Sequence, residues 1–272
     1  SVWAMWHQMQ EGDFVQTYTE KGFRGNDKEW ESMCIPFGED AKICLNGVID
    51  RVDLCSLPGE ELIKIIDYKS SDSQDLLLAK VYYGLQMQLL TYLEAAKEMV
   101  EKEHKGKEAV PAAMLYYAIK EKNLDWKPES EEEYEKRVLD SMKCKGYVNE
   151  EPEIIGHLDK SVVNGGELIP GQKSGVVPVA VDKKGLLKKN SGALSTKDFE
   201  TLIAHTKEKM KECGKAILDG KIEAIPYVYE DNDGCTYCPY GSVCGHESKK
   251  DGVREMKKMS DDEVWEALYG DD

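Results

Sequence analysis

The sequence lacks an apolar run long enough to cross a membrane, and it shows no signal peptide. Its first residues, SVWAMWHQMQEGD, contain neither a basic head nor an apolar segment. We therefore expect a cytoplasmic protein. The chain also lacks an initiator Met and begins inside a pattern that predicts a helix at residues 2–12, so we expect a piece of a longer protein.

Positive charge is scarce. The chain has 36 Lys and Arg against 52 Asp and Glu, a net charge of −16. This balance argues against non-specific nucleic-acid binding over the whole surface, but it leaves room for a local basic path. The densest basic cluster is Lys183, Lys184, Lys188 and Lys189, although a solvated loop is the commoner explanation for such a run.

The hydrophobic pattern predicts strands and helices in an α/β order. Apolar and β-branched runs predict strands at 31–37, 42–45, 47–54, 62–68 and 109–119, with shorter ones at 153–156 and 174–181. Helical spacing predicts helices at 75–103, interrupted near Gly84, and at 130–142, 196–219 and 261–269. We expect a central mixed β-sheet flanked by helices in residues 1–228, and a cysteine-containing C-terminal extension in residues 229–272 that packs on the same domain.

Two carboxylates and a lysine occupy strand positions that suit a metal site. Asp50 lies in GVIDRVD, and Asp67 and Lys69 end the next strand in IIDYKS. Strand side chains alternate with period two, so Asp67 and Lys69 share a face that a neighbouring Asp50 can approach. Mg²⁺ prefers oxygen ligands, here Asp50, Asp67 and the carbonyl of Tyr68. With Lys69 orienting a metal-bound water or stabilising a pentavalent phosphate, the set predicts phosphodiester hydrolysis.

Each of these residues also has a commoner explanation that involves no active site. A D-x-K triplet alone occurs by chance in most proteins, and Asp67 and Lys69 can simply form an ion pair. That explanation leaves the similar context of Asp50 unexplained. Gln88 and Tyr92 share a helix face at spacing i, i+4 and can both reach the same site, whereas taken singly a surface glutamine and a core tyrosine are commoner.

Three of the eight cysteines are crowded near the C-terminus. Cys235, Cys238 and Cys244 follow a C-x2-C-x5-C spacing, which suits zinc or an iron–sulfur cluster with a fourth ligand elsewhere. His246 can complete a zinc site, so spacing leaves both open. We expect the scattered cysteines to be small buried residues: Cys34, Cys44, Cys55, Cys144 and Cys213.

The motifs together resemble a known family. G-x-x-D-R-x-D, then D-Y-K-S-S, then Q-x-x-x-Y are similar in order and spacing to the RecB-like branch of the PD-(D/E)xK nuclease superfamily. The resemblance implies a mixed sheet flanked by helices and DNA cleavage with Mg²⁺ or Mn²⁺. It implies that Asp50 and Asp67 bind the metal, that Lys69 is catalytic, and that Gln88 and Tyr92 contact DNA or order the site. Arg51 and Asp53 match the motif in supporting roles.

RecB-like nucleases with a C-terminal cysteine triplet form two groups, those of CRISPR adaptation and the AddB-type nuclease domains of bacterial helicase–nucleases. The long insertion after residues 112–119 and the segments 218–227 and 261–268 resemble the AddB-type domain. Within that group the resemblance implies a [4Fe–4S] cluster held by Cys235, Cys238 and Cys244. It also implies an AddA-type partner subunit and cleavage of the 5′-ended single strand delivered by a helicase during double-strand break repair. The family's fourth cluster cysteine has no counterpart here, and His7 lies too close to the first strand to be the family's upstream histidine, so we expect an incomplete cluster and weak activity in this chain.

Two other functions stay open at this point. One is a nuclease-like module that has lost activity and serves as a docking or cluster-binding platform. The presence of Asp50, Asp67 and Lys69 disfavours it. The other is a RecB-like nuclease of CRISPR adaptation, which predicts a complete four-cysteine cluster within one chain.

Overall fold

The computed structural model describes residues 10–25, 30–37, 41–70, 75–119, 130–247 and 252–270. Most of the helix predicted at 2–12, including His7, lies outside these ranges. No helix within them combines the length and the apolar character that a membrane crossing needs.

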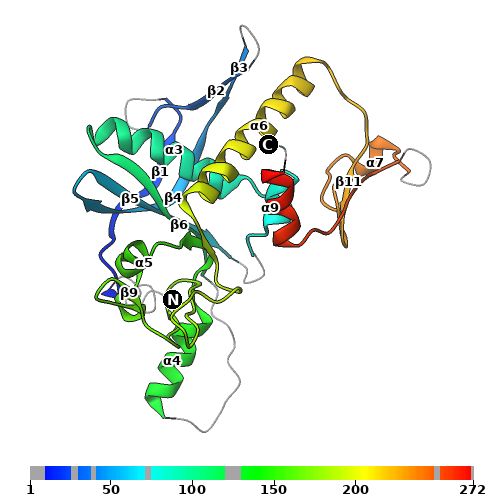
Figure 1. The fold of residues 1–272 in the computed structure, drawn as a ribbon. Coiled ribbons are helices and arrows are strands. Elements are labelled where there is room, and N and C mark those ends of the chain that lie inside the picture. The colour runs from blue at the N-terminus through cyan, green and yellow to red at the C-terminus, as the bar shows by residue number, and fades with distance from the viewer. Residues whose placement is uncertain are drawn as a thin grey trace. The chain divides into compact units, whose positions relative to one another are not determined.

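A six-stranded mixed sheet carries the fold (Figure 1). It consists of β1 (Val15–Phe23), β4 (Gly47–Leu57), β5 (Glu60–Lys69), β6 (Glu108–Ala118), β7 (Lys145–Asn149) and β10 (Ala193–Leu194) in the order β1-β4-β5-β6-β7-β10. β5 and β6 are parallel, as are β7 and β10, and the other neighbours are antiparallel. The expected mixed α/β sheet is confirmed. β1, β7 and β10 were missed from the sequence.

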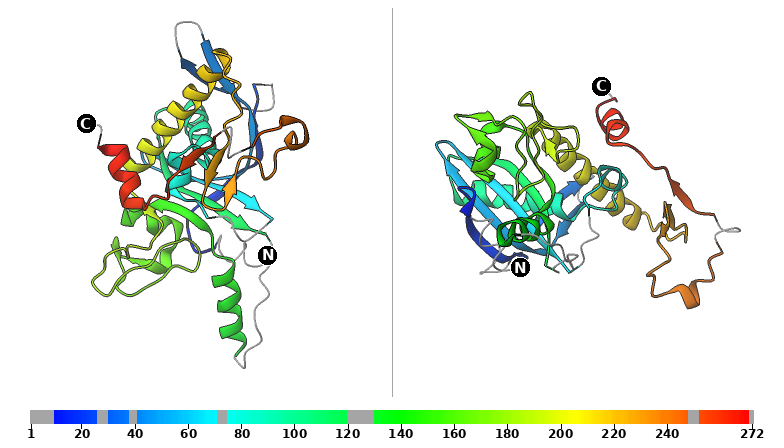
Figure 2. Two further views of the ribbon diagram at one scale, coloured as in Figure 1. Left: turned by 90° about the vertical axis from the view of Figure 1, so that its right-hand side faces the viewer. Right: turned by 90° about the horizontal axis from the view of Figure 1, so that it is seen from below.

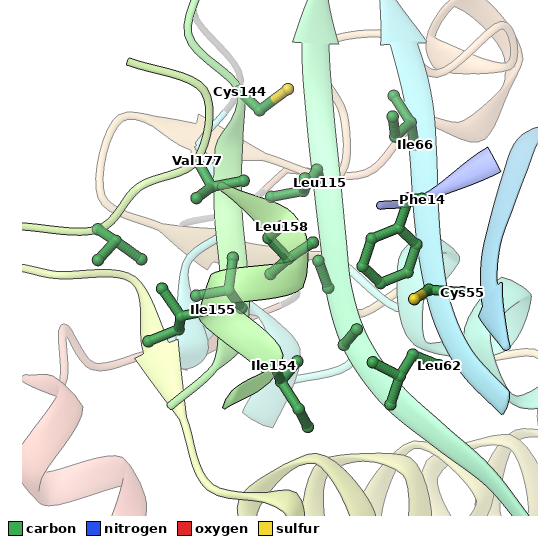
Figure 3. Packing of buried hydrophobic residues seen from close by; sticks show 14 of the residues in the cluster. Phe14, Cys55, Leu62, Ile66, Leu115, Cys144, Ile154, Ile155, Leu158 and Val177 are labelled. Carbon is green, nitrogen blue, oxygen red and sulfur yellow. The ribbon is translucent and has the colours of Figure 1, made fainter. Parts of the chain in front are cut away.

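Helices cover both faces of the sheet. The predicted helix 75–103 is divided at Gly84, whose φ is +76°, into α2 (Leu78–Tyr82) and α3 (Gln88–Glu103). α3 packs on β5 and β6 through one face. On the opposite face, α5 (Pro152–Leu158) packs its Ile154, Ile155 and Leu158 against strand residues such as Leu62 and Leu115 (Figure 3). The functional residues sit between these layers, on the α3 face.

Residues 153–156 form part of helix α5, so the strand predicted there is wrong. Pro152 occupies the first helical turn, where its missing N–H is no loss. Ile154, Ile155 and Leu158 are buried together at helical spacing, and only the β-branched pair suggested a strand. The strand predicted at 174–181 is also wrong: apart from isolated bridges at Ala180 and Val181, that stretch has no ladder.

The remaining elements of this part of the chain are short or lie at its surface. α4 (Glu131–Ser141) is helical as predicted, has no buried residue and extends away from the sheet (Figure 2). A 3-10 turn at Lys160–Val162 precedes a small hairpin of β8 (Val163–Asn164) and β9 (Glu167–Leu168).

The chain divides into two compact units. The first comprises 1–34, 44–76 and 87–204 and contains the six-stranded sheet. The second comprises 35–43, 77–86 and 205–272. The domain boundary expected between residues 228 and 229 therefore falls inside the second unit.

The second unit is built from helices and short strands. It contains the later part of α6 (Thr196–Leu218), α7 (Gly241–Cys244), α9 (Asp261–Tyr269) and a small sheet of β11 (Tyr227–Tyr229), β12 (Asn232–Asp233) and β13 (Arg254–Met256). The predicted helices 196–219 and 261–269 are confirmed. Each starts with a reciprocal cap, Ser195 with Asp198 and Ser260 with Glu263.

A disulfide corrects the expectation for the scattered cysteines. Cys34 of β2 (Met33–Phe37) and Cys44 of β3 (Ala41–Leu45) are bonded across the hairpin, and both are exposed. Cys213 is exposed as well, whereas Cys55 and Cys144 are buried as expected. β2 and β3 are neighbours in one two-stranded sheet, which is why these two cysteines meet.

Candidate active site

Asp50 and Asp67 come together where β4 and β5 meet. The antiparallel register aligns Arg51 with Ile66, so the next step along both strands places Asp50 opposite Asp67. The amide of Tyr68 donates a hydrogen bond of 2.8 Å to Asp50 Oδ2, which holds that carboxylate against the end of β5. The expected neighbourhood of the two carboxylates is therefore present.

Asp67 is a buried carboxylate, 3% exposed. Burial raises its pKa, the Lys69 ammonium opposes that shift, and the charge of Asp50 adds to it. Its Oδ2 atom receives no hydrogen bond of normal geometry from the described residues, although the Lys69 ammonium lies 2.5 Å away as an ion pair. A second cation beside these two carboxylates would relieve their repulsion.

Lys69, Gln88 and Tyr92 form one chain of contacts. The Lys69 ammonium donates to Gln88 Oε1 at 3.1 Å, and Gln88 Nε2 lies 3.0 Å from the Tyr92 hydroxyl. The i, i+4 spacing on α3 thus brings Gln88 to the lysine and Tyr92 to Gln88, so both side chains belong to one site, as the sequence indicated. Tyr92 also packs edge-on against Phe23 of β1, with ring centroids 6.0 Å apart.

Tyr116 belongs to the site and was missed from the sequence. It lies opposite Asp67 on the parallel strand β6 and is 3% exposed. The Lys69 ammonium is 5.1 Å from the centre of its ring, within the range of a cation–π contact. Burial, together with the charge of Asp67, raises the pKa of Tyr116 to about 12. The sequence alone does not reveal this residue, because its place opposite Asp67 depends on the pairing of β5 with β6, two strands that lie far apart in the sequence.

Arg51 and Asp53 face the other side of β4. They form a two-point ion pair, with distances of 2.6 Å and 2.8 Å, and are 2% and 0% exposed. The ammonium of Lys64 also lies 2.9 Å from Asp53. These motif residues pack on the face of β4 opposite Asp50, consistent with the supporting roles expected for them.

The donor set at the strand ends suits a hard divalent cation. Asp50 and Asp67 offer carboxylate oxygens, and Mg²⁺ typically takes one or two carboxylates, with water and substrate phosphate filling its other positions. Among the described residues, no three His, Cys, Asp or Glu side chains are grouped closely enough to enclose a metal. Asp50 and Asp67 are the described carboxylates that could hold such an ion at the ends of β4 and β5.

The cysteine triplet lies in the second unit. Cys235, Cys238 and Cys244 are all exposed. The carboxylate of Asp233 accepts hydrogen bonds from the amides of Cys235 and Thr236, and the amide of Cys238 donates to the Cys235 carbonyl. The thiols share one short turn-rich segment, but in the described geometry they do not enclose a common point.

Comparison with known proteins identifies the family. The sequence matches the family model described as "PD-(D/E)XK nuclease superfamily" over residues 1–245. The chain belongs to the PD-(D/E)XK nuclease superfamily. Its strand-borne carboxylates Asp50 and Asp67, followed by Lys69, occupy the mixed sheet of this nuclease fold.

Relatives of this PD-(D/E)XK chain are much longer proteins. It is 34% identical over 270 residues to a protein of Lachnoclostridium phytofermentans that is named as a subunit of an ATP-dependent helicase/deoxyribonuclease, and the alignment covers 98% of this chain and 22% of that protein. Proteins with the same name from Thermoanaerobacter sp. (strain X514) and Clostridium botulinum (strain Loch Maree / Type A3) are 32% and 33% identical, again over 98% of this chain and 22% and 23% of theirs. The chain therefore spans about a fifth of the length of these relatives.

Proposed function

We propose that the chain is the Mg²⁺- or Mn²⁺-dependent deoxyribonuclease domain of a bacterial helicase–nuclease subunit that resects double-strand breaks for recombinational repair. The observation that carries this proposal is the continuous set of contacts from Asp50 through Tyr68 and Asp67 to Lys69, Gln88 and Tyr92. A simple ion pair between Asp67 and Lys69 would not require the contacts with Asp50, Gln88 and Tyr92.

Each side chain has a role in this proposal. Asp50 and Asp67, with the carbonyl of Tyr68, would hold the metal, and a bound divalent ion lowers the pKa of its water and polarises the phosphate. Lys69 places its charge beside the position of the scissile phosphate, where negative charge develops in the transition state. Gln88 fixes the ammonium of Lys69 from α3, and Tyr92 fixes Gln88.

Cleavage of end-labelled single-stranded DNA tests the reaction. We expect Mg²⁺-dependent shortening by the wild type, none in EDTA, and a loss of at least about a hundredfold in Asp67→Ala. Glu60→Ala is the matched control, because Glu60 is an exposed carboxylate at the other end of β5. Equal activity in wild type and Asp67→Ala would contradict the assignment. If the wild-type chain is inactive, the complete subunit carrying the same substitutions decides between a nuclease and an inactive platform.

The names of the relatives support a partner and a substrate for this domain. A protein named as one subunit of a helicase/deoxyribonuclease implies at least one further subunit, which we propose is an AddA-type helicase–nuclease. We propose that the helicase delivers the 5′-ended strand as a single strand, so that this acidic chain needs little DNA affinity of its own. Tight duplex binding by the chain at physiological salt would count against this part.

We also propose that Cys235, Cys238 and Cys244 are three ligands of a [4Fe–4S] cluster in the whole protein. Three exposed thiols within ten residues suit iron–sulfur ligation, and a fourth ligand must come from elsewhere. Such a cluster would cross-link the second unit through its iron–thiolate bonds. It would take no part in the hydrolysis.

Iron and acid-labile sulfide determination on the complete subunit tests the cluster. We expect both elements in the wild type and their loss in Cys238→Ser. Cys213→Ser is the matched control, because Cys213 is an exposed cysteine outside the triplet. Retention of iron and sulfide in Cys238→Ser would exclude Cys238 as a ligand.

A further inference from the structure

Lys145 lies in one row with two residues of the candidate active site. The sheet register aligns Tyr116 of β6 with Asp67 of β5 on one side and with Lys145 of β7 on the other. Residues aligned in this way project to the same face of a sheet. Cys144 points the other way, into the cluster with Leu115 and Ile66 (Figure 3), which agrees with that placement. Lys145 therefore faces the side of the sheet that carries Asp67.

Backbone packing fixes this row. Gly146 follows Lys145 with φ of +127°, and a Cβ atom there would lie only 2.3 Å from the Met114 carbonyl oxygen. Glycine alone tolerates both the positive φ and the close approach of β7 to β6. The position of Lys145 opposite Tyr116 is thus set by the chain itself.

The charge of Lys145 is balanced by an exchangeable partner. Its ammonium lies 2.8 Å from Asp75 Oδ1, and the two side chains are 36% and 62% exposed. Ion pairs at such exposure contribute little free energy, so a phosphate group can replace Asp75 at small cost.

The spacing separates this lysine from the scissile phosphate. Neighbouring strands are about 4.8 Å apart, so β7 lies roughly 10 Å from β5. A phosphate held at Lys145 is therefore a different one from the scissile phosphate proposed beside Asp67 and Lys69. A single DNA strand that runs along the edge of the sheet, where β5 and β6 end and β7 begins, can meet both positions while Tyr116 stays buried.

We propose that Lys145 binds a backbone phosphate of the substrate strand next to the scissile phosphate, and that Asp75 is its counter-ion when DNA is absent. This inference rests on the proposed nuclease function, because it takes the DNA to lie at Asp67. It places the DNA strand along the edge of the sheet, from the end of β5 to the start of β7.

Binding of a fluorescent single-stranded oligonucleotide in EDTA at low salt tests the contact without cleavage. We expect Lys145→Ala to raise Kd about tenfold for any base sequence and to reduce the slope of log K against log salt by about 0.7, the value for one lost phosphate contact on a single strand. Lys145→Arg should keep the slope, and Asp75→Asn should lower Kd. The control is Lys160→Ala, because Lys160 is also paired with an exposed aspartate, Asp13, but follows α5 on the other face.

Cleavage assays separate this inference from the proposed function. With Mg²⁺, Lys145→Ala should raise KM and leave kcat unchanged, whereas Asp67→Asn should abolish kcat. An unchanged slope and KM in Lys145→Ala, or a change equal to that of Lys160→Ala, would overturn the inference while leaving the nuclease intact. A reduced slope without any cleavage by the complete wild-type subunit would keep the phosphate contact and remove the proposed reaction.

Discussion

Arg51 and Asp53 form a buried two-point ion pair directly behind the strand position that presents Asp50. Their hydrogen bonds measure 2.6 Å and 2.8 Å, and neither side chain reaches solvent to any extent. Because Asp50 lies on the other face of the same strand, the pair can stabilise the site without touching the substrate.

Removal of one member of this pair should destabilise the fold strongly. In Asp53→Ala, the charges of Arg51 and Lys64 lose their partner inside the protein, a situation that typically costs about 3–5 kcal/mol, and we expect a loss of that size. Urea unfolding followed by circular dichroism measures it. The double variant Arg51→Met/Asp53→Leu should be less destabilised than Asp53→Ala, since it leaves fewer buried charges unpaired. Equal losses in the two proteins would contradict this explanation.

Gln88 should affect turnover more than stability. It is an exposed residue that links Lys69 to Tyr92, so Gln88→Ala removes one of the contacts that hold the ammonium of Lys69 while the fold stays intact. We expect kcat to fall about 10- to 100-fold, as for other residues that orient a functional group. Tyr92→Phe is the comparison: it keeps the ring against Phe23 and removes only the hydroxyl, so its effect should be smaller. A larger loss of kcat in Tyr92→Phe than in Gln88→Ala would contradict the assignment of Gln88 as the residue that holds Lys69.

Local rules were enough to predict the contacts inside single elements. Period-two alternation placed Asp67 and Lys69 on one face, and helical spacing placed Gln88 beside Tyr92. Tyr116 and Lys145 could not be found this way, because their relation to Asp67 depends on which strands pair and in which register. Parallel pairing of β5 with β6 joins residues about fifty positions apart, and no local pattern encodes it.

The helix at 152–158 shows a different limit of prediction from the sequence, because its local signal was present and a strand was still predicted. The local signal was present: Pro at the first turn and apolar residues at Ile154, Ile155 and Leu158. The segment is so short that two adjacent β-branched residues outweighed that signal in the prediction. Burial of all three apolar side chains against the sheet decides the conformation, and that burial is a tertiary effect.

Asp67 should lower the stability of the metal-free protein. Its carboxylate is buried beside Asp50, and the Lys69 ammonium offsets the unfavourable effects of burial and of the Asp50 charge only in part. We therefore expect Asp67→Asn to raise Tm in EDTA by a few degrees, while Mg²⁺ raises Tm in the wild type but no longer in the variant. Differential scanning calorimetry with and without Mg²⁺ measures both effects. A lower Tm of Asp67→Asn in EDTA would show that the Lys69 pair outweighs the repulsion.

Glu61 should make stability depend on pH. It is 1% exposed and lies within 2.5 Å of Ser56 Oγ, 2.9 Å of Lys107 Nζ and 3.1 Å of His104 Nδ1. Burial alone would raise its pKa, but the hydrogen bonds from Ser56 and Lys107 outweigh burial and hold the pKa below its ordinary value of 4.5. A lowered folded-state pKa stabilises the fold above the unfolded value, and this stabilisation is lost as pH falls through the folded one.

Comparison of wild type with Glu61→Gln isolates this contribution. Near neutral pH the variant should be less stable by about 2 kcal/mol, since it loses hydrogen bonds to a charged group. Below the folded-state pKa of Glu61 the two proteins should converge. Urea titrations across the acidic range provide the measurement, and a difference that stays constant down to the lowest pH would exclude a role for the ionised carboxylate.

The Cys34–Cys44 disulfide should stabilise its hairpin in a way that a reductant removes. The bond closes a loop with a sequence separation of 10, for which chain entropy predicts about 2–3 kcal/mol, and both cysteines are exposed to reductant. We expect dithiothreitol to lower Tm in the wild type, and Cys34→Ser/Cys44→Ser to show that lower Tm with or without reductant. Cys213→Ser controls for the exposed free thiol and should respond to dithiothreitol as the wild type does. Because the hairpin carries none of the proposed catalytic residues, kcat should stay the same in all these proteins; a parallel fall in kcat would place the hairpin in the reaction.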